Sequence, residues 1–141
     1  MRLAKKTQYG LQILLQLAVS AKLVQAKDIA AEQNLNEPYV EQLLAALKRS
    51  GLVRTARGRR GGYRLARACG RVTLLDVIET FEGPLELTET ADATAGNGNV
   101  HAQAAMMVWG SLTGLMRETS ADITLETILA RENYLMPDYV I

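Results

Sequence analysis

The stretch NLNEPYVEQLLAALKRSGLVRTARGRRGGYRL, residues 34–65, changes its periodicity once, at Gly51. Before that glycine, apolar residues recur at spacings of three and four, which predicts a helix with one buried face (Val40, Leu43, Leu44 and Leu47). Asn36 suits the N-cap of this helix and Pro38 suits its first turn. After Gly51, residues 52–57 and 62–65 alternate as two antiparallel strands around a Gly-Arg-Arg-Gly tip.

The rest of the chain extends this arrangement on both sides. Helical spacing predicts helices over residues 5–21 and 26–33 upstream, and over 74–81 downstream, where Thr73 is the cap. Residues 86–99 have neither period and are predicted to form a mobile loop. A long helix over 100–119, a short helix over 125–130 capped by Thr124 and a tail over 134–141 complete the chain. The predicted fold is mainly α with a small antiparallel β-hairpin.

These elements form a winged helix-turn-helix followed by a long dimerisation helix. We expect a DNA-binding domain over residues 1–83, a loop over 84–99, and the dimerisation helix with its tail over 100–141. The long helix is apolar on two faces, which indicates that its own domain covers one and a second copy covers the other. A central helix in one larger core is the alternative.

Charge is distributed unevenly along the chain. Residues 1–75 hold fourteen Lys and Arg against four acids, a net charge of +10, and the remainder holds two against eleven, a net charge of −9. The basic half favours a polyanionic partner. Mutual neutralisation of the two halves within one body is the alternative.

The residues with the chemistry for duplex recognition lie in two groups. On the third helix, Asn36, Tyr39, Glu41 and Gln42 face outward near its start, where glutamine can pair with adenine and glutamate can accept from cytosine. In the hairpin, Arg57, Arg59 and Arg60 flank or form the tip, and Arg57 or Arg59 suits a narrow minor groove. A solvated charge run and an RNA-binding segment are the alternatives for the tip.

Taken together, residues 1–11, 39–44, 51–58, 61–66 and 74–84 resemble the Rrf-two family of bacterial winged-helix transcription regulators. The resemblance implies a homodimer that crosses its long helices on a pseudo-palindromic operator. It also implies base contacts from the segment Asn36 to Gln42 and a minor-groove contact from Arg57. A regulatory partner protein can govern regulators of this kind.

The sequence departs from that family at one place. Many relatives hold an iron–sulfur cluster through three cysteines in the loop before the long helix, whereas residues 86–105 here contain none. Cys69 is the chain's single cysteine and His101 its single histidine, and this pair does not supply a cluster's ligands. We therefore predict no cofactor and no metal site. Replacement of cysteines by the alanines that crowd this region is the alternative.

The sequence predicts a cytoplasmic, dimeric, sequence-specific DNA-binding regulator that acts as a repressor. No apolar run approaches the length of a membrane span, so no membrane partner is expected. No catalytic site is expected either, because no third group orients Cys69 and His101 as nucleophile and base. A winged-helix module that docks on a protein without touching DNA is the main rival.

Overall fold

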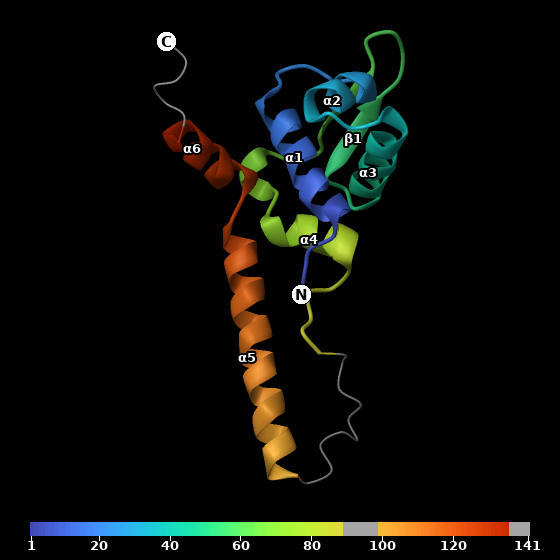
Figure 1. Ribbon diagram of the computed structural model, residues 1–141. Helices are drawn as coiled ribbons and strands as arrows, with labels where there is room; N and C mark the ends of the chain where they lie inside the picture. Colours follow the sequence, from blue (N-terminus) through green and yellow to red (C-terminus); the bar gives the residue numbers. More distant parts are fainter. Residues whose placement is uncertain (89–98, 136–141) are drawn as a thin grey trace.

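The computed structural model describes residues 1–88 and 99–135 of the 141-residue chain. Its elements follow the order α1 (Lys5–Val19), α2 (Ala26–Gln33), α3 (Glu37–Arg49), β1 (Val53–Ala56), β2 (Gly62–Leu65), a 3-10 turn η1 (Cys69–Arg71), α4 (Leu74–Glu82), α5 (Val100–Asp122) and α6 (Leu125–Leu135). Figure 1 shows helices α1 to α4 and the hairpin gathered into one body, from which α5 extends away. The predicted fold, mainly helical with one antiparallel hairpin, is confirmed.

The core lies where α1, α2, α3 and α4 meet beneath the hairpin. Ten of its side chains are large and fully buried: Ile13, Leu14, Ile29, Val40, Leu44, Leu47, Leu52, Val72, Val77 and Leu125. The last of these belongs to α6, so the chain returns to the N-terminal body after the long helix. Burial of this apolar surface is the main force that fixes α3 relative to the hairpin.

The boundaries of the helices follow the local capping chemistry. The Asn36 side chain accepts a hydrogen bond from the Tyr39 N–H at 2.8 Å and caps α3. Thr73 and Asp76 exchange hydrogen bonds in a capping box at the start of α4. Helix α1 ends at Val19, two residues earlier than predicted, because the Ser20 hydroxyl bonds the backbone of Lys22 and turns the chain.

The hairpin, which we call the wing, is fastened to the segment between α1 and α2. Its strands pair in the register Val53 with Leu65 and Ala56 with Gly62. Val24 and Tyr63 exchange two further backbone hydrogen bonds. The Val24 N–H donates to the Tyr63 carbonyl at 3.0 Å, and the Tyr63 N–H donates to the Val24 carbonyl at 2.8 Å. This bridge sets the position of the wing relative to α2 and α3.

Gly62 permits that close approach, and we expect Gly62→Ala to break it. Gly62 has φ +153°, and a Cβ there would lie 2.7 Å from the Val24 carbonyl oxygen. The variant should lower the free energy of unfolding by about 1–3 kcal/mol in urea denaturation. Gly58→Ala is the matched control, because Gly58 also has a positive φ but a Cβ there would meet nothing within 4 Å. An equal loss of unfolding free energy in both variants would show that the close approach to Val24 does not contribute to stability.

A carboxylate anchors the start of the chain to the end of α4. Glu82 Oε1 accepts from the Thr7 hydroxyl at 2.6 Å and from the Ala4 N–H at 2.7 Å. The bond from Thr7 and then the bond from Ala4 lower the pKa of Glu82, and the nearby charge of Lys6 lowers it further. The anchor thus joins the helix-turn-helix to the element that leads towards α5.

The pH dependence of this anchor follows from the sign of its shift. Because the pKa of Glu82 is lower in the folded chain than its ordinary value of 4.5, its stabilisation is present above pH 4.5 and is lost as the pH falls through the folded pKa. Glu82→Gln should therefore unfold at lower urea than the parent chain at pH 7, and the difference should shrink in acid. Glu118→Gln, on the exposed surface of α5, is the control. A difference that stays constant between pH 7 and pH 3 would contradict the anchor.

The C-terminal elements differ from the prediction in three respects. Helix α5 continues to Asp122 and α6 to Leu135, so the predicted tail from Tyr134 begins too early. The prediction that the chain's own body covers one face of α5 was wrong for most of the helix, because Ser120 is the one buried residue among the described residues of α5. The C-terminal part of α5 lies beside α4 (Figure 1), where Arg117 forms an ion pair with Glu79 at 3.1 Å.

Two other predictions fall partly outside the described residues. Residues 89–98, which are most of the loop predicted to be mobile, lie outside the described residues, and so does the tail from residue 136. Within residues 1–88 and 99–135, no helix combines the length and hydropathy that a membrane span requires.

Candidate nucleic-acid interface

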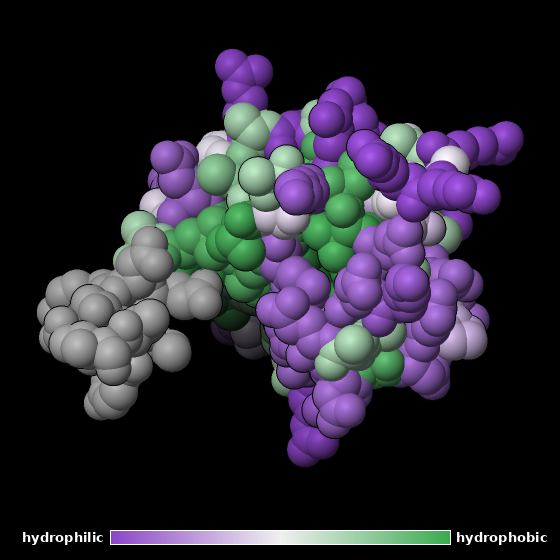
Figure 2. Space-filling model, turned by 90° about the horizontal axis from the view of Figure 1, so that it is seen from above, coloured by the Kyte–Doolittle hydropathy of each residue, from purple (hydrophilic) through white to green (hydrophobic). Residues whose placement is uncertain are grey.

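A groove of about 440 Å³ joins the start of α3 to the wing. We call it the recognition groove; its charged lining residues are Lys27 from α2, Glu37 and Glu41 from α3, and Arg57 from the wing. The structure thus brings together Glu41 and Arg57, two residues predicted from separate parts of the sequence. Hydrophilic side chains cover most of this end of the molecule, and several project outward (Figure 2).

Two of the predicted residues on α3 also have a structural role. The Asn36 side-chain oxygen is occupied as the cap of α3, so its NH₂ group is the part left to donate to a base. The Tyr39 ring lies edge-to-face against Tyr9 of α1, with the ring centroids 6.1 Å apart. Tyr39 is half-buried there, and its ring therefore helps to hold α3 on α1.

The other predicted residues are exposed but do not all share one surface. Gln42 lies exposed on α3, and Arg59 lies exposed at the tip of the wing. Arg60 lines a separate hollow with Lys22 and Lys27. This hollow shares Gln25, Lys27 and Gly61 with the recognition groove, so Arg60 lies next to the groove but not in its lining.

The sequence prediction missed two residues at the start of α2. Gln25 and Lys27 line the recognition groove together with Arg57. The Gln25 side chain also reaches the wing, where it donates to the Arg59 carbonyl at 3.5 Å. Lys27 is one of the cations in the basic half, but only the bridge from Val24 to Tyr63 brings it close to the wing.

The charges in the groove are free to meet a ligand. The two ion pairs within residues 1–88 and 99–131 are Arg67 with Asp76 and Arg117 with Glu79, and both lie outside the groove. Arg57, Arg59 and Lys27 are exposed cations that can bind phosphates, while Glu41 and Gln42 carry groups that read base edges. This arrangement is compatible with contacts to both the phosphates and the base edges of a duplex.

The profile of the Rrf2 family, described as iron-dependent transcriptional regulators, matches residues 3–131. The chain belongs to the Rrf2 family. The match confirms the resemblance seen in the sequence motifs. It also confirms the general function: the chain is a DNA-binding transcriptional regulator with a winged helix-turn-helix.

Relatives within the Rrf2 family match over nearly the whole chain. The HTH-type transcriptional regulator CymR of Bacillus subtilis is 32% identical over 130 residues, which cover 91% of this chain and 89% of CymR. The solved structure of CymR, the global cysteine regulator of B. subtilis, is 30% identical with a TM-score of 0.77, and the match covers 93% of this chain and 98% of that one. The structure of T. potens IscR is 32% identical, has a TM-score of 0.72 and covers 94% and 88%.

The donor set of this Rrf2 chain does not fit an iron–sulfur cluster, although the family description names iron. Such clusters are held mainly by several cysteine thiolates. The single cysteine, Cys69, lies half-buried in η1. Among the residues that the structure describes, no group of three His, Cys, Asp or Glu side chains could hold a metal ion. We therefore assign no step of DNA binding to iron.

Proposed function

We propose that this Rrf2 regulator binds a pseudo-palindromic operator as a homodimer and represses transcription there. The observation that carries the proposal is the recognition groove, which combines base-reading side chains of α3 with cations of α2 and the wing. The family match favours this reading over the rival of a winged-helix module that docks on a protein without touching DNA.

In the proposed complex, the first turns of α3 enter the major groove. Glu41 and Gln42 contact base edges, while the NH₂ group of Asn36 and the hydroxyl of Tyr39 lie beside them. Arg57 enters the adjacent minor groove, where the negative potential is strong. Arg59, Arg60 and Lys27 bind the flanking phosphates, which fix the register of the protein but carry no sequence information.

The proposed dimer forms through α5. Large apolar side chains are exposed along it, and they include Met107, Val108, Trp109, Leu112 and Leu115. Val108, Leu112 and Leu115 recur at spacings of four and three and so form an apolar stripe along one face of α5, and exposed apolar patches of this kind mark interaction surfaces. Self-association of this stripe places two copies of α3 on one duplex, which matches the two half-sites of a pseudo-palindrome.

Glu41→Ala is expected to change which operators are bound more than it changes total affinity. The glutamate faces a polyanion, so its removal relieves repulsion while it abolishes a contact to cytosine. The ratio of affinities between the preferred operator and its single-base variants should fall about tenfold in binding titrations. Glu118→Ala controls for the change in charge. A uniform loss of affinity across all operators would contradict a base contact by Glu41.

A further inference from the structure

A second hollow lies behind the wing and shares no lining residue with the recognition groove. Its volume is about 630 Å³, and it lies between the end of α1, the turn that follows α1, and strands β1 and β2. Small-molecule sites in proteins fall in the range of about 300–1,000 Å³. The hollow therefore has the size of a ligand site that the proposed DNA contacts do not use.

Two arginines occupy directly opposite positions on the strands of the hairpin at this hollow. Arg54 and Arg64 are paired in the register of β1 and β2, so their side chains emerge on the same face of the sheet. Both are exposed, and Val53, the neighbour of Arg54, points the opposite way into the core. Like charges directly opposite one another across two strands are destabilising. A bound anion would relieve this repulsion.

No side chain that lines the hollow supplies such an anion. Lys22 and Arg67 line it as well, and none of its lining residues is acidic. Asp76, an acid near by, pairs with Arg67 at 3.6 Å. Arg54 donates only to the Ala66 carbonyl at 3.3 Å, and Arg64 forms no ion pair with any residue in the described part of the chain.

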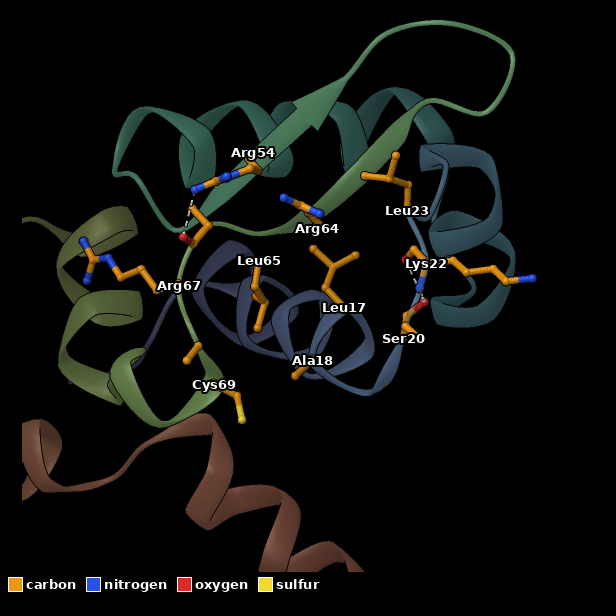
Figure 3. Close-up of a pocket in the computed structure, with 13 residues that line it drawn as sticks. Leu17, Ala18, Ser20, Lys22, Leu23, Arg54, Arg64, Leu65, Arg67 and Cys69 are labelled. Carbon is orange, nitrogen blue, oxygen red and sulfur yellow. Dashed lines mark hydrogen bonds between the residues drawn. The ribbon is translucent and has the colours of Figure 1, made fainter.

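The floor of the hollow is apolar. Figure 3 shows Arg64 at the centre, above Leu17 and Leu65, with Leu23 to one side, while Lys22 and Arg67 extend outward. Leu17 is buried, and Leu23 and Leu65 are half-buried. Cations over an apolar floor suit a ligand with an anionic head and an apolar body, whereas a duplex backbone offers only the charge.

We propose that the hollow behind the wing binds a small organic anion, in which a carboxylate or phosphate group lies between Arg54 and Arg64 and a short apolar body contacts Leu17, Leu23 and Leu65. Guanidinium groups bind such oxyanions through charge-assisted hydrogen bonds. The ligand would contact β2 at its Arg64, next to the Tyr63 bridge that positions the wing.

The test is a titration of the full chain without DNA, followed by backbone amide NMR shifts, so its outcome is independent of the operator proposal. Phenyl phosphate and inorganic phosphate are the probes, and sodium chloride at equal ionic strength is the blank. We expect saturable shifts around residues 22, 54 and 64, with phenyl phosphate binding about tenfold more tightly than phosphate because its ring contacts the leucines. Arg64→Gln should weaken both probes about tenfold or more.

Two further variants separate the proposal from its competitors. Leu23→Ala should remove most of the advantage of phenyl phosphate, and Arg49→Gln, at the exposed end of α3, should leave both titrations unchanged. Equal shifts at the tip of the wing and in the hollow, or equal affinity for the two probes, would mean an adventitious ion only and would overturn the proposal. Loss of duplex binding in Arg64→Gln without saturable phenyl phosphate binding would make this face a DNA contact and would overturn it as well.

Discussion

Replacing Arg57 and Arg59 together with alanine should lower the affinity for duplex DNA about 100-fold, because each lost charge-assisted contact contributes about 1.5–3 kcal/mol. Both arginines are exposed, Arg57 in the recognition groove and Arg59 at the tip of the wing. Neither is part of the core, so the variant should unfold at the same urea concentration as the parent chain.

The salt dependence of binding gives the sharper measurement. Each cation that releases counterions from the duplex contributes about 0.9 to the slope of log affinity against log salt. The loss of Arg57 from the minor groove and of Arg59 from a phosphate should therefore reduce that slope by nearly two units. Arg71→Ala with Arg131→Ala is the matched control, because it removes the same charge from exposed residues of η1 and α6. If the control loses as much affinity and slope as the wing variant, the effect is one of net charge, and the wing makes no direct contact.

The local elements of the fold could be predicted from the sequence because their signals are local. Asn36 and Thr73 cap the helices that their positions predict, and the change of period at Gly51 marks the start of the wing. Apart from the half-buried Tyr39, the predicted contact residues on α3 and the wing are exposed, and Glu41 and Arg57 line one groove.

What the sequence could not predict depends on contacts between distant residues. The bridge from Val24 to Tyr63 places Gln25 and Lys27 beside the wing, and nothing in the period of α2 indicates this. The same holds for the edge-to-face contact of Tyr9 with Tyr39. The two apolar faces of α5 predict that the helix is buried, but they do not predict which surface covers it. The body of the chain covers α5 only near the C-terminal end of that helix.

The exposed apolar stripe of α5 leads to the second large effect, which we expect for Leu115→Glu. Leu115 is 61% exposed in the single chain, so a glutamate there is solvated and should leave the unfolding of the monomer unchanged. In the proposed dimer both copies lose a buried leucine, worth about 1.5–3 kcal/mol each, and must desolvate a carboxylate in addition. The dissociation constant of the dimer should therefore rise about 100-fold or more in sedimentation equilibrium.

The affinity for DNA should fall when dimerisation is lost, and only for an operator with two half-sites. A monomer holds one half-site and loses the gain in effective concentration that the linked second copy supplies. A duplex with a single half-site should bind Leu115→Glu as well as it binds the parent chain, because α3 and the wing are untouched. Gln103→Glu adds the same charge to an exposed polar position of α5 and is the control. A Leu115→Glu protein that still dimerises with the parent's dissociation constant would place the interface elsewhere, since no carboxylate pair buried in an apolar seam escapes its desolvation cost.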